Sequence, residues 1–254
     1  MLVPASTLNR MASPPQRRRA ARHQQRLDSD AAATGRAGRA AGRRQPITVD
    51  GIVETALGIV ERDGYPALTM RRVASALGTG PASLYAHVVN KEDLDDLLIG
   101  RLCGRINLPQ PDAGNWREQI IDVCGQLRDQ YLRYPGISQA ALAVVPTNTE
   151  TLRVNEGMLA LVLAGNVDPQ TAAWAVDALV LYVNAFCLET SLADRQVDQE
   201  GWDVSRGELH ARFKALPDTF PNTRRYADEL TSGTPLDRFA FTLALIVGAL
   251  HAAG

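Results

Sequence analysis

Apolar residues recur at helical spacing between residues 48 and 104, and capping residues divide this stretch into short helices. Thr48 can accept hydrogen bonds from the first amides of one amphipathic helix, which we expect to end at Gly64. Thr69 can cap a second helix of about two turns, and Gly78 follows it where a left-handed residue is usual. The pattern therefore predicts two helices followed by a glycine turn.

A third and a fourth helix follow the turn. Thr79-Gly80-Pro81 predicts a cap with proline in the first turn, and a short helix from about Pro81 to His87. Leu84 and Val88 are expected to face the second helix. The outward residues are Ala82, Ser83, Tyr85, Ala86 and His87, which are small or hydrogen-bonding. Asn90 can cap the next helix, whose buried stripe would be Leu94, Leu97 and Leu98.

Residues 68–98 therefore have the form of a helix-turn-helix, which places one helix in a DNA groove. The segments ERDGYPALTM, RRVASALG, SLYAHV and NKEDL resemble, in this order, the N-terminal domain of the TetR (tetracycline repressor) family of transcriptional regulators. The resemblance covers residues 47–104 and implies a DNA-binding domain there. It also implies a C-terminal helical domain that binds a small molecule and forms a homodimer, so that the operator would be an inverted repeat in double-stranded DNA.

The resemblance also assigns DNA contacts. Tyr85, His87 and Lys91 match residues that bind backbone phosphates, and Thr69 matches a further phosphate contact. Arg71 matches a position that can reach a base edge, where its two-pronged guanidinium suits guanine. Tyr85 and His87 could alternatively be packing residues. The full predicted set is Thr48, Thr69, Arg71, Thr79, Gly80, Pro81, Ala82, Ser83, Tyr85, Ala86, His87 and Lys91. Few of these side chains are polar, so readout is expected to rely on thymine methyl groups, Arg71 and DNA shape.

Residues 1–46 differ in composition from the rest of the chain. They contain ten arginines and two acidic residues, a net charge of +8, so the remainder carries −9 of the total of −1. With few large apolar residues, this segment cannot bury a core, and we expect a disordered arm that strengthens DNA binding. There are two alternatives. The segment could be a solvated extension with little effect on DNA binding, or translation could begin at Met11.

Residues 105–254 are predicted to form a second, entirely helical domain that is large enough for its own core. Prolines and glycines delimit the expected helices. These helices are 116–133, 136–143, 149–164, 169–190, 206–216, 222–230 and 236–252. The predicted fold class is therefore all-α, with an N-terminal helix-turn-helix domain and a C-terminal ligand-binding and dimerisation domain.

Two segments, 174–188 and 239–250, are apolar nearly all round. Such helices must be covered on every side, which favours a four-helix interface built from two helices of each subunit. Small residues at Ala178, Ala185, Ala244 and Gly248 would let partner helices approach closely. Deep burial within one subunit is the alternative.

A binding site for a small-molecule effector is implied by the same resemblance. Its predicted wall consists of Leu127, Tyr131, Asn155, Met158, Val162, Trp174, Tyr182 and Phe186, with Asn184 or Glu189 as further polar contacts. Core packing is the alternative role for each of them. Such an apolar pocket suits a lipophilic or aromatic molecule. Binding is expected to move the helix at 90–102 and to change the separation of the two recognition helices.

The sequence therefore predicts a repressor that a small molecule releases from DNA. A ligand-dependent activator and a sequence-tolerant DNA-binding protein driven by the basic arm are the alternatives. No nucleophile elbow, phosphate loop or metal-spaced cluster is present, so we expect no catalysis, no cofactor and no metal. The three cysteines have no paired spacing, which favours reduced thiols over a redox sensor. No apolar run reaches the ~20 residues needed to cross a bilayer, so we expect a cytoplasmic protein without a membrane partner.

Overall fold

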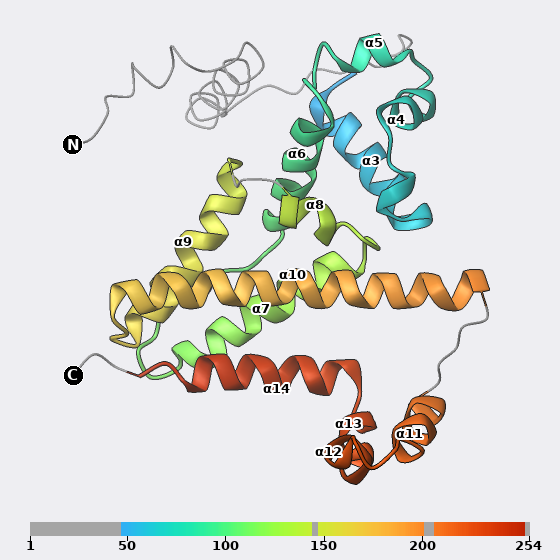
Figure 1. Cartoon of the computed structure of the whole chain (residues 1–254). Helices are drawn as coiled ribbons and strands as arrows, with labels where there is room; N and C mark the ends of the chain where they lie inside the picture. Colours follow the sequence, from blue (N-terminus) through green and yellow to red (C-terminus); the bar gives the residue numbers. More distant parts are fainter. Residues whose placement is uncertain (1–46, 144–146, 201–205, 252–254) are drawn as a thin grey trace, which may run out of the picture. The chain divides into compact units, whose positions relative to one another are not determined.

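The computed structural model describes residues 47–143, 147–200 and 206–251, and their side chains except those of 194–200 and 206. Every regular element within these ranges is a helix, which confirms the all-α prediction (Figure 1). The predicted arm at residues 1–46, with its alternative start at Met11, lies outside the described residues.

The first two helices begin at the predicted caps. Helix α3 spans Val49–Asp63, and the side chain of Thr48 accepts a hydrogen bond from the amide of Gly51 (3.0 Å). Helix α4 spans Met70–Ala76, and Thr69 accepts from the amide of Arg72 (3.1 Å). A single 3-10 turn, η1 (Tyr65–Ala67), joins them and was not anticipated from the pattern.

The next two helices carry the turn and the link to the rest of the chain. Gly78 has a φ of 66°, a left-handed conformation that a residue without Cβ adopts at no steric cost. Helix α5 is regular only over Pro81–Leu84, and its N-cap is Gly80, which has no side chain to accept a hydrogen bond from the first amides. Helix α6 spans Lys91–Cys103, and Asn90 accepts from the amide of Asp93 (2.8 Å), as expected.

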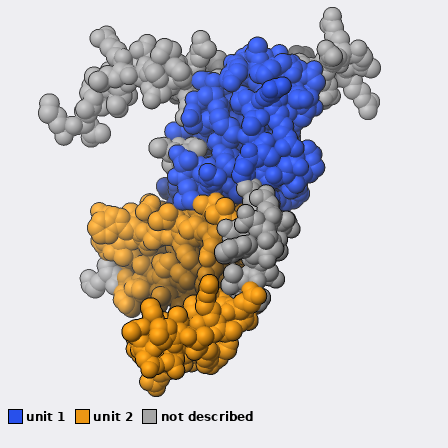
Figure 2. Space-filling view, turned by 45° about the vertical axis from the view of Figure 1, so that its right-hand side comes forward, with its two compact units in different colours: residues 1–108, 133–157 blue, residues 109–132, 158–254 orange. Residues whose placement is uncertain are grey.

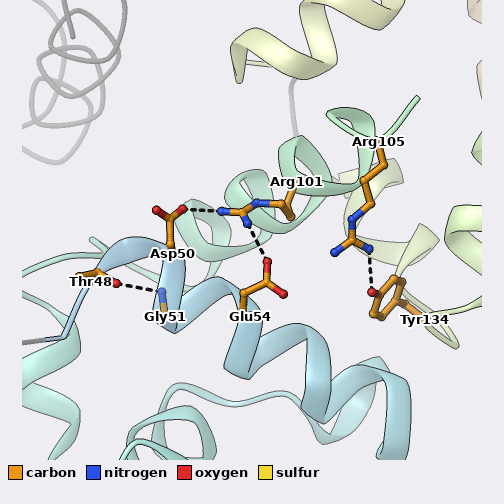
Figure 3. Close-up of polar contacts among 7 residues, drawn as sticks. All are labelled: Thr48, Asp50, Gly51, Glu54, Arg101, Arg105 and Tyr134. Carbon is orange, nitrogen blue, oxygen red and sulfur yellow. Dashed lines mark hydrogen bonds and ion pairs between the residues drawn. The ribbon is translucent and has the colours of Figure 1, made fainter. Parts of the chain in front are cut away.

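The chain folds into two compact units, coloured in Figure 2. Of the described residues, one unit combines 47–108 with those between 133 and 157, and the other combines 109–132 with those between 158 and 251. In the first unit, α6 packs against α3. The guanidinium of Arg101 on α6 pairs with Asp50 and, at 2.7 Å, with Glu54, both on α3 (Figure 3).

Residues 133–157 complete the first unit by packing along α6. Helix α8 (Ser138–Ala143) contacts α6 directly. Arg105, two residues beyond the end of α6, donates to the hydroxyl of Tyr134 (2.8 Å; Figure 3). The hydroxyl of Thr147 donates to Asp96 of α6 (3.1 Å). Asn148 lies close to Gly100 of α6, where an added Cβ would collide with the Asn148 side chain. A larger residue at position 100 would require the Asn148 side chain to move.

The start of helix α9 (Thr149–Ala164) makes a further contact with α6. Arg153 donates to the carbonyl oxygens of Cys103 (2.9 Å) and Ile106 (3.1 Å), which lie at the end of α6 and just beyond it. Because the last carbonyls of a helix lack partners within it, a cationic donor at this place stabilises the helix end. Residues 133–157 thus contact α6 at several points along its length.

The second unit is built on three helices that pack on one another. Helix α10 (Pro169–Glu200) packs against α7 (Trp116–Leu132) and α14 (Pro235–Gly248), and α14 also contacts α7. Three short helices follow α10 in the sequence and precede α14: α11 (Arg206–Lys214), α12 (Pro221–Arg225) and α13 (Ala227–Thr231). These three helices pack against one another.

Several helix boundaries differ from the prediction. Helix α10 continues ten residues beyond Thr190, because no glycine or proline interrupts the polar sequence before Gly201. The single helix expected at 222–230 is two short helices that meet at Tyr226. Helix α14 ends at Gly248, earlier than the predicted 252.

Candidate functional site

The helix-turn-helix has an inner and an outer side, divided as the sequence predicts. Leu84 and Val88 are fully buried, together with Val73 of α4, whereas Leu77 is only half-buried. Most of the predicted DNA-contacting residues of the turn and of α5 are exposed. They are Gly80, Pro81, Ala82, Ser83, Tyr85 and Ala86, with Thr79 and His87 half-exposed. The outer side of α5 thus has a surface of small side chains and one large exposed ring, Tyr85, at 50% exposure.

Two capping threonines contribute hydroxyl groups to this part of the molecule. Thr48 and Thr69 are both exposed, and each uses its oxygen as an acceptor for a backbone amide. A hydroxyl that accepts one hydrogen bond keeps its own proton as a donor. Each can therefore cap its helix and donate to a phosphate oxygen at the same time.

The two arginines at the start of α4 have different surroundings. Arg72 donates to Asp63 (2.6 Å), which ties α4 to the end of α3. Arg71 is exposed, and no described residue forms a hydrogen bond or ion pair with its guanidinium. Of the pair, Arg71 is the one whose five donors are available for a base edge.

Lys91 is less available than the resemblance suggests. Its ammonium group pairs with Asp95 on the next turn of α6 and donates to the hydroxyl of Tyr65 (2.9 Å). Neither Tyr65 nor Asp95 was singled out from the sequence, since thirty positions separate them and only the fold brings them together.

The predicted effector wall is largely buried within the second unit. Leu127 and Tyr131 of α7, Met158 and Val162 of α9, and Phe186 of α10 are all buried. Tyr182 is half-buried, and its ring stacks on that of Phe239 at 5.6 Å between centroids.

An aromatic cluster in this unit includes residues that the sequence did not assign to the wall. Phe239 of α14 lies 4.7 Å from Phe186, and the guanidinium of Arg128 lies 4.8 Å from the Phe239 ring centroid. The helix at 239–250 is apolar on every side, so its pattern could not indicate which ring would face inward. The cluster extends the apolar wall to α14.

Two predicted wall residues lie elsewhere. The side chain of Trp174 is 69% exposed, on the face of α10 that also carries Leu181, so it does not belong to the buried set. Periodicity could not separate the inner from the outer face of so apolar a helix. Asn155 is half-buried, but it belongs to the first unit rather than the second.

The polar groups named for this site also differ in their surroundings. Glu189 is exposed and pairs with Arg238 (2.8 Å). Asn184 is buried, and its side-chain oxygen has no hydrogen-bond partner among the described residues. A buried acceptor without a donor costs free energy, so Asn184 is suited to receive a donor from a bound molecule.

All three cysteines are buried. Burial raises the pKa of the Cys124 and Cys187 thiols to about 12, so both stay protonated at neutral pH. We expect the folded protein to resist iodoacetamide at about pH 8, whereas all three cysteines should react after denaturation, as measured by mass spectrometry. Rapid alkylation of one thiol in the folded protein would instead point to a redox-active cysteine.

No group of three or more metal-ligating side chains lies together within the described ranges.

One membrane-related expectation needs correction. The segment Pro169–Ala193 of α10 contains an 18-residue window with a mean hydropathy of 1.6, and it is long and apolar enough to be a candidate membrane span. Asp177 and Glu189 interrupt the apolar run in the sequence. Within the second unit, α10 packs against α7 and α14, and this packing buries part of its apolar surface.

The outer faces of α10 and α14 remain strongly apolar. Exposed on α10 are Trp174, Ala178, Leu181, Ala185 and Leu192, and exposed on α14 are Phe241, Ala244, Leu245 and Gly248. We call this set the α10/α14 face. Because the two helices pack on each other, it joins large apolar residues with small ones on neighbouring helices.

Comparison with known proteins identifies both parts of the chain. Residues 52–95 match the family described as bacterial regulatory proteins, tetR family. Residues 108–253 match the tetracyclin repressor-like C-terminal domain.

Individual relatives agree with these matches. The HTH-type transcriptional repressor DrrR1 of Streptomyces coeruleorubidus is 29% identical over 214 residues, which cover 83% of this chain and 79% of that protein. An HTH-type transcriptional regulator of Saccharopolyspora erythraea is 32% identical over 187 residues, which cover 70% and 78%.

Among solved structures, ActR from Streptomyces coelicolor in complex with actinorhodin is similar, with a TM-score of 0.73 and 36% identity over 80% of this chain and 95% of that chain. The match at residues 108–253 alone covers more than half of the sequence. The chain therefore belongs to the tetR family of bacterial regulatory proteins.

Proposed function

We propose that this regulator is a repressor, that it binds an inverted-repeat operator as a homodimer, and that a small molecule releases it. The observation that carries the proposal is the exposed outer side of α5, presented by a helix-turn-helix in which Val73, Leu84 and Val88 on the inner side are fully buried. A cytoplasmic location accords with contact with DNA.

The proposed DNA contacts divide by chemistry. Thr48, Thr69, Tyr85, His87 and Lys91 would bind phosphates, and such contacts position the protein without reading sequence. Arg71 would read a base edge, and the residues Thr79 to Ser83 would lie in the major groove. With so few donors in that stretch, methyl contacts and DNA shape would supply the remaining specificity.

Dimerisation would use the α10/α14 face. In this family context, two copies of the face would form a four-helix interface, with the small residues allowing close approach. Monomeric proteins rarely expose so continuous an apolar surface without a partner. Two-fold symmetry would then present two copies of α5 to successive half-sites.

The proposed effector is lipophilic and aromatic. Phe186, Tyr182 and Phe239 supply aromatic surface, and Asn184 supplies an acceptor for a hydroxyl or amine donor. The similar protein ActR has been crystallised with actinorhodin and with (S)-DNPA. We infer an effector that combines fused or linked rings with at least one hydrogen-bond donor.

Coupling between effector and DNA would pass through α6. The first half of α9 is joined to α6 through Arg153, and Thr147 and Asn148 lie against it just before. The second half of α9 carries Met158 and Val162 of the proposed effector wall. A ligand that shifts α9 would therefore act on α6, which in turn is paired with α3 through Arg101.

Binding to DNA from the region upstream of its own gene tests this function. We expect specific retardation over scrambled competitor, retained when residues 1–46 are removed, and weakened by actinorhodin as a probe effector. Arg71→Ala should reduce preference for the specific site by about 1–3 kcal/mol. Equal affinity for operator and scrambled DNA, with steep salt dependence, would favour the sequence-tolerant binder. Binding that requires the probe would favour a ligand-dependent mode.

A further inference from the structure

Lys91, at the first position of α6, lies in a small cluster of three side chains. Its ammonium group pairs with the carboxylate of Asp95 and donates to the hydroxyl of Tyr65 (2.9 Å). The Tyr65 hydroxyl in turn donates to the other oxygen of Asp95 (2.8 Å). The ammonium nitrogen also lies 4.2 Å from the centroid of the Tyr65 ring. Each member of the cluster thus contacts both of the others.

Burial makes these contacts stronger than those of an ordinary surface pair. The side chain of Asp95 is only 7% exposed, and that of Lys91 is 32% exposed. Screening by water is weak around a buried carboxylate, so its attraction for the ammonium group is larger than in solvent. Burial and the neighbouring Asp95 raise the pKa of Tyr65 far above its usual value, so its hydroxyl stays protonated and remains a donor.

We propose that Asp95 and Tyr65 are positioning residues for Lys91, which hold it along α6 and offset its charge, so that they limit its attraction for a DNA phosphate. The proposal rests on the proposed function, in which Lys91 is a phosphate contact. It assigns to α6 a built-in counter-ion that reduces sequence-independent binding, since that binding depends on the number of uncompensated cations.

The Asp95→Asn substitution tests the charge of the counter-ion while keeping its shape. The amide oxygen of asparagine can still accept from Tyr65 or Lys91, so the cluster keeps an acceptor. Removal of the negative charge should free about one positive charge for DNA. We expect the slope of log affinity against log salt to steepen by about 0.9, and binding at about 50 mM salt to tighten about threefold or more.

The experiment uses the full-length protein with operator and scrambled DNA over a salt series from about 50 to about 200 mM. Glu92→Gln is the matched control, because it removes an acidic charge from the same helical turn at an exposed position outside the cluster. Asp95→Glu keeps the charge and should retain a slope close to that of the unmodified protein. The double variant Lys91→Met, Asp95→Asn should lose the gain, since there is no ammonium group to release.

Nuclear magnetic resonance separates the failure of this inference from the failure of the proposed function. Lys91 and Lys214 are the two lysines of the chain, so labelled ammonium signals are simple to assign, and Lys214 serves as an internal reference. Operator DNA should shift the Lys91 signal and leave that of Lys214 in place. No shift of Lys91 would remove it from the DNA contacts, whereas a shift together with an unchanged slope in Asp95→Asn would overturn the role of Asp95.

The same spectrum tests the inference if the asparagine variant does not fold. In the unmodified protein, Lys91 should exchange its ammonium protons more slowly than Lys214, whose partner Asp228 is exposed. Equally fast exchange of both would contradict the proposed hold on Lys91.

Discussion

A charge placed on the α10/α14 face should separate the proposed dimer and abolish operator binding at working concentrations. We expect this result for Leu181→Glu and for Leu245→Glu, because each leucine is largely exposed in the single chain and would be enclosed in the four-helix interface. Two-fold symmetry introduces the carboxylate twice. An unpaired buried ion costs several kcal/mol, and about 3 kcal/mol corresponds to a hundredfold weaker dimer.

Sedimentation velocity over a concentration series measures the dimer, and gel retardation on the operator measures the consequence. Leu163→Glu is the matched control, since Leu163 is also an exposed leucine of the second unit but lies on α9. It should leave both measurements unchanged. Dimers that persist in both face variants would show that the subunits associate elsewhere and that the apolar faces have another use.

The second large effect is expected from Leu84→Ala. Leu84 is the buried residue of α5, with no exposed surface, and it contacts the core of the first unit. Truncation of a buried leucine costs about 2–5 kcal/mol through lost burial and the cavity that remains. We expect a lower unfolding midpoint and a loss of operator affinity of at least tenfold, because α5 has too few residues to keep its orientation without this contact.

Thermal unfolding followed by circular dichroism measures the first effect, and sedimentation shows whether the dimer persists. Ser83→Ala provides the control. Ser83 precedes Leu84 in the sequence but its side chain is exposed, so the substitution should leave the unfolding midpoint unchanged. The prediction is wrong if Leu84→Ala retains both its stability and its affinity, since the orientation of α5 would then come from other contacts.

Local rules predicted the helix-turn-helix well. The caps at Thr48, Thr69 and Asn90 depend on hydrogen bonds over three residues, and the left-handed turn at Gly78 depends on one residue. Such features depend only on residues within a few positions of one another, so they can be predicted from the local sequence. The division of α5 into an inner and an outer side follows from the same short range.

Contacts between distant segments were beyond this kind of reasoning. Nothing near Lys91 indicates that Tyr65 will meet it, and the close approach of Asn148 to Gly100 joins a residue just before α9 to one on α6. The placement of Trp174 failed for another reason. An α-helix that is apolar all round has no polar face that marks its solvent side. The sequence therefore does not distinguish its buried residues from its exposed ones until the neighbouring helices are known.

The slight attachment of α5 to the core has a consequence for the evolution of regulatory networks. Thr79, Ala82 and Ser83 contribute little to the buried core, so their replacement changes stability little. A duplicated gene could therefore drift toward a new operator through these positions while Leu84 preserved the scaffold. Promoter preference in such a lineage can diverge faster than architecture, and paralogues in one genome can avoid cross-talk after few substitutions.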